Sequence, residues 1–187
     1  MNFTPTPSQT VGPYLHLGLT DARSISRVAG DAAKGQRVWL TFRVVDGDGA
    51  PVPDAMIELW QADSEGNYAH QHSSADGAAF RGFGRLPTAD DGSCSFETIR
   101  PGCVPGPGET VQAPHINVSI LGRGILKRLS TRVYFAGEPA NGVDPVLTLV
   151  PENRRATLLA QPDPARTSHW IFDVHLRGDG ETVFFDV

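Results

Sequence analysis

Short runs in which every second residue is apolar recur along almost the whole chain, separated by glycine and proline. Residues 38–44 have this period of two, and it returns in 115–121, 129–135 and 170–176. Such a period places successive side chains on opposite faces of a β-strand. The 20 glycines and 15 prolines lie mostly between the runs, where they favour turns. The pattern therefore predicts an all-β protein.

The number and spacing of the runs predict a β-sandwich of roughly eight to ten mostly antiparallel strands with long loops. A chain of 187 residues is long enough for one core, so we expect a single domain over 1–187. Residues 1–20 are proline-rich and aperiodic, which predicts an extended arm. Residues 144–163 are the one convincing helical stretch, so we expect one or two short helices. A final strand is expected within 181–187.

Charge and hydropathy exclude two classes of function. The net charge is −5, and no large basic cluster is present, which argues against binding to nucleic acid. No run of 18 apolar residues predicts a membrane span, and the first ten residues do not resemble a signal peptide, so we expect a cytoplasmic protein. Cys94 and Cys103 lack CxxC spacing and are expected to be reduced, partly buried thiols.

The stretch "APHINVSILGRG" at 113–124 combines a strand pattern with a histidine on its polar face. His115, Asn117 and Ser119 alternate with three apolar residues. A His-x-His pair on one strand face would point two imidazoles at one metal ion, but asparagine occupies the second position here. The residues alone leave three interpretations open: a degraded metal site, a different kind of site, or a polar strand face.

The other candidate sites are weaker. His70 and His72 form the only His-x-His, and two exposed loop histidines are the preferred interpretation because neither a strand nor carboxylates and thiolates at ligand spacing flank them. The sequence contains no nucleophile elbow, phosphate-binding loop or dinucleotide fingerprint. The residues by themselves support at most a polar site near Arg123 that tolerates anions.

Five motifs in one order carry a family resemblance: "TPSQTVGPYLHLGL", "IELWQAD", "APHINVSILGRG", "TRVYF" and "GETVFFDV". Together they resemble the α subunits of protocatechuate 3,4-dioxygenases, within the intradiol ring-cleaving dioxygenase family. The resemblance implies a β-sandwich subunit of a heteromeric enzyme of aromatic catabolism (the β-ketoadipate pathway). With O2, that enzyme cleaves 3,4-dihydroxybenzoate to 3-carboxy-cis,cis-muconate. It also implies a homologous β subunit as partner, which binds non-haem Fe(III) through two tyrosines and two histidines.

Carried over to this chain, the resemblance implies that most of the iron ligands are missing. His115 and Asn117 occupy the two histidine positions, and Val104 occupies one tyrosine position. An ungapped count places the other tyrosine position near His72, and Gln112 stands where the β subunit has an arginine. An amide is a poor ligand for ferric iron, and a single imidazole does not hold it. The resemblance thus implies a chain without metal, whose partner binds the iron.

The resemblance also implies a substrate pocket where the two subunits meet, lined from this chain by Thr10, Gly12, Pro13, Tyr14 and Arg123. A guanidinium favours a substrate carboxylate, and the Gly-Pro pair favours a tight turn that approaches a flat ring. For Arg132, a structural ion pair is the preferred interpretation.

Two alternatives stand beside this assignment. The first is a stand-alone β-sandwich binding module, because a fold does not fix a function. The second is a homo-oligomeric dioxygenase with its own iron, against which the missing tyrosines and Asn117 argue.

Overall fold

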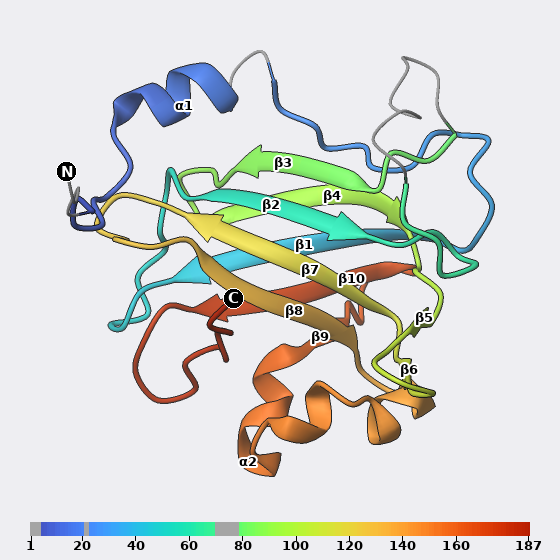
Figure 1. Ribbon diagram of the computed structural model, residues 1–187. Coiled ribbons are helices and arrows are strands. Elements are labelled where there is room, and N and C mark those ends of the chain that lie inside the picture. The colour runs from blue at the N-terminus through green and yellow to red at the C-terminus, as the bar shows by residue number, and fades with distance from the viewer. Residues whose placement is uncertain (1–4, 21–22, 70–78) are drawn as a thin grey trace, which may run out of the picture.

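The structure is a computed structural model that describes residues 5–20, 23–69 and 79–187, and its strands form two facing layers (Figure 1). The elements, in chain order, are α1 (Pro13–Leu19), β1 (Arg37–Val45), β2 (Met56–Gln61), β3 (Phe83–Pro87), β4 (Ser93–Ile99), β5 (Val104–Pro105), β6 (Val111–Gln112), β7 (His115–Leu121), β8 (Leu129–Phe135), η2 (Pro139–Val143), η3 (Leu147–Leu149), α2 (Glu152–Arg155), η4 (Ala156–Leu158), β9 (Leu159–Pro162) and β10 (His169–His175).

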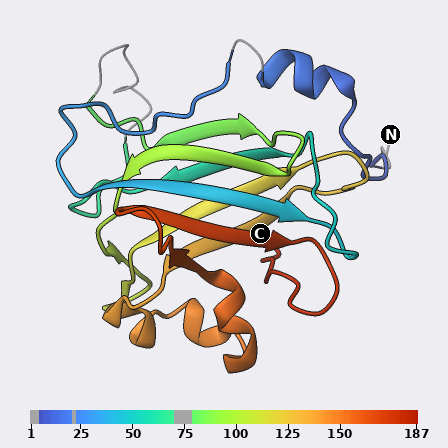
Figure 2. The same ribbon diagram turned by 180° about the vertical axis from the view of Figure 1, so that it is seen from behind.

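The two layers belong to one mixed sheet of eight strands, in the order β3-β2-β7-β8-β9-β10-β1-β4. Strand β9 joins the layers, because it pairs in parallel with β8 and antiparallel with β10. Figure 2 shows the second layer from behind, with β1, β4 and β10 in front. The β1–β10 and β8–β9 pairs are parallel and the other pairs are antiparallel. The predicted all-β fold of mostly antiparallel strands is confirmed.

A segment outside the named strands, residues 25–29, connects the two ends of this sheet. Ile25 bridges to Arg85 of β3, and Arg27 bridges to Glu97 of β4. The amide of Val28 donates to the Glu97 carbonyl at 2.9 Å, and the amide of Ile25 donates to the Arg85 carbonyl at 2.7 Å. Both end strands therefore have backbone partners on their outer sides, and the sheet curls nearly into a barrel.

The hydrophobic core lies between the two layers. On β1 the predicted alternation holds: Val38, Leu40, Phe42 and Val44 are fully buried. Phe42 lies at the centre, with the rings of Phe96 and Phe172 packed edge-on at centroid distances of 5.8 Å each. The inward side chains of β7 and β8 cover this cluster from the opposite layer.

Residues 144–163 do not form the single helix that their pattern favours. The stretch breaks into η3, α2 and η4, each of three or four residues, and ends as strand β9. The Asp144 carboxylate accepts hydrogen bonds from the amides of Val146 and Leu147, which starts a tight turn, and Pro151 prevents continuation into the next element.

The two chain ends also differ from expectation. Residues 5–12 of the arm form no helix or strand, but a helix, α1, begins at Pro13, where the fixed φ of proline suits a first helical turn. Residues 181–187 form no strand, although the amide of Phe185 donates to the Ser130 carbonyl at 2.7 Å.

The two cysteines are free thiols in different surroundings. Cys94 is buried, and burial raises its pKa to about 12, which keeps it protonated and unreactive. Cys103 is exposed, so the expectation of a partly buried thiol is wrong there. Within the described residues, no helix has the length and apolar character needed to cross a membrane.

Candidate functional site

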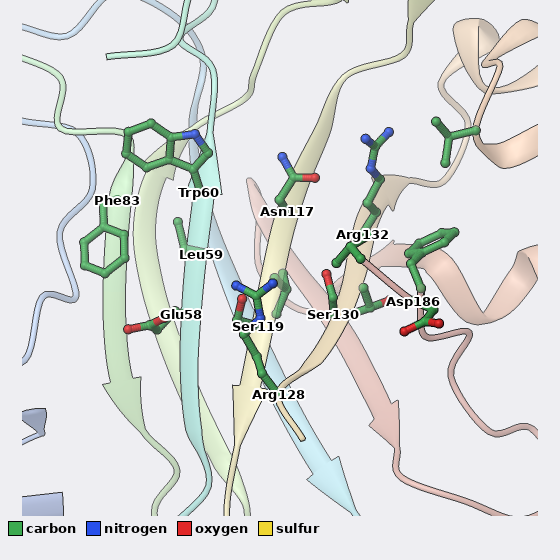
Figure 3. Close-up of a pocket in the computed structure, with 15 residues that line it drawn as sticks. Glu58, Leu59, Trp60, Phe83, Asn117, Ser119, Arg128, Ser130, Arg132 and Asp186 are labelled. Atoms are coloured by element: carbon green, nitrogen blue, oxygen red, sulfur yellow. The ribbon is translucent and has the colours of Figure 1, made fainter. Parts of the chain in front are cut away.

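The polar face of β7 lies in a groove on the outer side of the β2–β7–β8 layer (Figure 3). The groove has a volume of about 680 Å³. Its floor includes one cross-strand row, because Trp60 of β2 is directly opposite Asn117 of β7, which is directly opposite Arg132 of β8. Directly opposite side chains on neighbouring strands are close enough to interact. The two candidate positions Asn117 and Arg132 therefore belong to one site.

Asn117 has a tyrosine as its partner. Its side-chain amide donates to the Tyr68 hydroxyl at 3.3 Å, and the Tyr68 ring stacks on Trp60 with centroids 6.0 Å apart. Sequence counting placed the second tyrosine position near His72 and did not identify Tyr68 as a neighbour of Asn117. The available signal was that the chain has only three tyrosines, one of which closely follows β2. His72 lies outside the described residues.

His115 is buried at the start of the same strand, with 2% of its surface exposed. Its Nδ1 lies 2.8 Å from the Ala113 carbonyl. Since a carbonyl only accepts, Nδ1 carries the proton of the neutral ring. Burial lowers the pKa of His115, and the charge of Arg132 lowers it further, against the opposing effect of the Ala113 hydrogen bond. The imidazole is therefore held in its neutral form.

This burial predicts a pH-dependent stability. Unfolded His115 takes up a proton near its ordinary pKa of 6.5, whereas the folded site resists protonation. Above pH 6.5 the ring is neutral in both states, and protonation takes nothing from the stability of the fold. As the pH falls below 6.5 towards the folded-state pKa, the unfolded chain binds the proton first, and the free energy of unfolding decreases. We expect the unfolding midpoint of His115→Gln to fall less between about pH 7.5 and pH 5.5 than that of the wild type. Thermal melts test this, with His16→Gln, at an exposed position, as a control that keeps the wild-type slope.

A buried carboxylate holds the backbone on which His115 stands. Asp144 is fully buried and accepts from the Ala113 amide at 2.7 Å and from the Tyr134 hydroxyl at 3.0 Å. Burial raises the pKa of Tyr134, so its hydroxyl stays protonated and donates. Asp144 thus fixes the positions of the strand entry and of the tyrosine beside His115.

Arg132 is half-buried, and the expected ion pair is not what the structure shows. Its Nη1 donates to Oε1 of Gln112 at 2.7 Å and lies 3.5 Å from the Tyr134 hydroxyl. None of the ion pairs within the part of the chain that is described involves Arg132. Its hydrogen-bond partners are neutral groups, and the Tyr134 hydroxyl links Arg132 to the buried Asp144 carboxylate.

The residues at the former ligand positions do not fit Fe(III). Val104 is an alkyl side chain on β5, opposite Gln112 and 5% exposed. Asn117 offers an amide that is bonded to Tyr68, and His115 offers one nitrogen of a buried ring. Ferric iron prefers several hard anionic donors. Over residues 5–20, 23–69 and 79–187, no three His, Cys, Asp or Glu side chains are grouped as a metal site.

The predicted substrate-contacting residues lie elsewhere, around the β7–β8 loop. The Thr10 hydroxyl accepts from the Gly124 amide at 2.8 Å and lies 3.4 Å from the Gly122 carbonyl, which attaches the arm on both sides of Arg123. Gly12, Pro13 and Arg123 line one pocket of about 340 Å³. The structure therefore brings four of the five predicted residues together.

Tyr14, the fifth residue, does not line this pocket and is 83% exposed. Arg123 forms an ion pair with Asp54 at 2.7 Å, while 77% of its side chain remains exposed. An exposed ion pair contributes little stability, so the guanidinium remains available to a second carboxylate.

The pocket at Arg123 and the groove at Asn117 are far apart. His115 begins β7 and Arg123 follows the end of the same strand, eight residues later. At about 3.3 Å per residue, an extended chain separates these two residues by about 25 Å. Figure 1 shows the N-terminal arm at the arrowhead of β7, with β5 and β6 near its other end. Within one copy of this chain, Arg123 and the former ligand positions do not form a common site.

The comparisons with known proteins identify the family of this chain. A family profile described as "Dioxygenase" matches residues 11–178. The chain is 45% identical to a protocatechuate 3,4-dioxygenase alpha chain from Burkholderia cepacia, over 97% of both chains. It is 36% identical to a protocatechuate 3,4-dioxygenase beta chain from the same species, over 79% of this chain and 67% of that one.

A solved structure shows the same fold. The dioxygenase domain of a dioxygenase–carbohydrate-binding fusion from Streptomyces sp. SirexAA-E matches with a TM-score of 0.64 and 29% identity, over 94% of this chain and 99% of that one. The fold, the order of the motifs and the identity over nearly the full length agree, and the chain belongs to the intradiol ring-cleavage dioxygenases, in the branch of the protocatechuate 3,4-dioxygenase α chains.

Proposed function

We propose that this chain is the subunit without iron of a heteromeric intradiol dioxygenase that cleaves 3,4-dihydroxybenzoate to 3-carboxy-cis,cis-muconate. In this reaction the bond between the two hydroxylated carbons breaks. Both atoms of O2 enter the two new carboxyl groups, so no further reductant is needed. The partner is a homologous β subunit, which holds the family's non-haem Fe(III), and the complex is cytoplasmic.

The separation along β7 is the observation that carries the proposal. Arg123 and the arm form a pocket suited to a carboxylate and a flat ring, but along β7 this pocket lies about 20 Å from Asn117 and about 25 Å from His115. Of the residues that line this pocket, only His16 and Asp54 carry groups that bind metals; Asp54 is paired with Arg123, and two donors are too few to hold Fe(III). A substrate held by Arg123 therefore reacts at a metal that another chain supplies.

The arm is proposed as the contact with that chain. Helix α1 buries none of its residues, and Tyr14 and Leu17 expose 83% and 66% of their surfaces. Apolar side chains grouped on an exposed helix favour a protein interface. The proposed role of Tyr14 is therefore in the interface beside the pocket, while Thr10, Gly12 and Pro13 shape the pocket wall.

Reconstitution tests the proposal. The chain purified by itself is expected to contain no iron and to turn over no 3,4-dihydroxybenzoate, because its own residues do not fit Fe(III). Co-expression with a homologous β chain that carries both tyrosines and His-x-His is expected to give a stable complex, iron and O2 uptake. Iron and turnover in the isolated chain would contradict the proposal. A chain that fails to associate with any such β subunit would favour the stand-alone binding module.

Replacing Arg123 is expected to weaken substrate binding selectively. In the complex, Arg123→Ala should raise the KM for 3,4-dihydroxybenzoate about tenfold or more, since a charge-assisted hydrogen bond to the carboxylate is lost. The KM for catechol, which lacks the carboxylate, should change little. Steady-state O2 uptake measures both, with Lys127→Ala on the same exposed loop as a control. Equal increases for both substrates would exclude the carboxylate role.

A further inference from the structure

We propose that the groove on the outer side of β2, β7 and β8 is a second binding site, one for a small aromatic carboxylate. The carboxylate pairs with Arg132 and the ring lies towards Trp60. This site is distinct from the pocket at Arg123 and does not use iron. It gives the polar face of β7 a function that its former ligand residues no longer provide.

The small number of direct hydrogen bonds that Arg132 makes to the described residues is the first observation. A half-buried guanidinium loses part of its hydration, and this loss is usually offset by a carboxylate. Arg132 contacts the neutral Gln112 side chain and the Tyr134 hydroxyl, which separates it from the Asp144 carboxylate, and both named contacts are made by Nη1. A guanidinium has five N–H donors. Most of the hydrogen-bonding capacity of Arg132 is therefore available to an anion that enters the groove.

The spacing of the row is the second observation. Trp60, Asn117 and Arg132 are successive partners across three neighbouring strands. Neighbouring strands are about 4.8 Å apart, so the backbones of Trp60 and Arg132 are about 10 Å apart. A benzene ring with one carboxylate has about this length, and it would share the Trp60 end of the row with the Tyr68 ring, which already stacks on Trp60. Figure 3 shows the Trp60 indole, the Asn117 amide and the Arg132 guanidinium in this order across the groove.

The acidic residues of the groove do not cancel this charge. Glu58 is already bound by Arg85, whose Nε lies 2.7 Å from its carboxylate oxygen. Asp186 also lines the groove, but it is exposed, and water screens its charge more than that of half-buried Arg132. Arg128 adds a second cation to the lining. An anion is therefore favoured at the Arg132 end of the row.

Titration of the full chain, without its partner, tests the proposal. Benzoate and 3,4-dihydroxybenzoate should bind by calorimetry, and catechol should bind at least tenfold more weakly. The choice of 3,4-dihydroxybenzoate rests on the proposed function, whereas benzoate tests the groove independently of it. In ¹H–¹⁵N spectra, the indole resonance of Trp60 should shift during the titration, while those of Trp39 and Trp170 should not. Absence of benzoate binding, or shifts that spare Trp60, would overturn the proposal.

Two arginine variants separate this site from the one at Arg123. Arg132→Gln should lower benzoate affinity on the order of tenfold to a hundredfold, the effect expected when a charged hydrogen-bond partner is lost. Arg123→Gln should leave the benzoate affinity that is read from the Trp60 shift unchanged. In the complex, the effects on the KM for 3,4-dihydroxybenzoate should be reversed, with an increase for Arg123→Gln and little change for Arg132→Gln. Benzoate binding that responds to Arg123 and not to Arg132 would overturn the second site. The Trp60 shift in the wild type decides the question even if Arg132→Gln does not fold.

Discussion

Replacing Asp144 with alanine is expected to lower the free energy of unfolding by about 4 kcal/mol, a loss of the size expected when a buried hydrogen-bond network is broken. The carboxylate is fully buried and accepts from the Tyr134 hydroxyl and from the amides of Ala113, Val146 and Leu147. Alanine would leave these donors without a partner in the protein interior. Urea denaturation followed by circular dichroism measures the change.

Two comparisons make this prediction specific. Asp144→Asn keeps one oxygen acceptor and should lose less stability than the alanine variant. Asp173→Ala removes an exposed carboxylate paired with Arg43 and should cost less than about 1 kcal/mol. If Asp144→Ala were as stable as Asp173→Ala, Asp144 would not hold the strand entry at Ala113 as described.

Replacing Phe42 with alanine is expected to lower the free energy of unfolding by about 3–5 kcal/mol. The Phe42 side chain fills the space between Phe96 and Phe172, and the two layers cannot collapse fully into the cavity that its removal leaves. The same denaturation experiment tests this. Thr41→Ala, on the outer face of the same strand, should stay within about 0.5 kcal/mol of the wild type. An equally small change in the free energy of unfolding for Phe42→Ala would show that the core is centred elsewhere.

The strands were predictable because each has one buried face. The period of two in β1, β7, β8 and β10 is a direct consequence of facing the core on one side only. The clustering of Thr10, Gly12, Pro13 and Arg123 followed from the family resemblance. It did not follow from any sequence pattern, because 110 or more residues separate the arm from the β7–β8 loop.

The helical segments were less predictable because tertiary contacts override local preference. Residues 159–162 follow a helical pattern, but they pair with β8 and β10 and so form a strand. Helix α1 has no buried residue, and hydrophobic period therefore gives no signal for it. The partners of Asn117 and Arg132, Tyr68 and Gln112, depend on loop lengths and on cross-strand register, which residue counting does not determine.

The segment 25–29 restricts how this chain can assemble. Because it is hydrogen-bonded to both β3 and β4, the outermost strands already have backbone partners on their outer sides. A partner therefore cannot extend the sheet by adding a strand to a free edge there, which is a common route to unwanted aggregation as well as to association. Association must instead depend on side chains, and the choice of partner is then specified by the sequence of the arm and of the sheet faces.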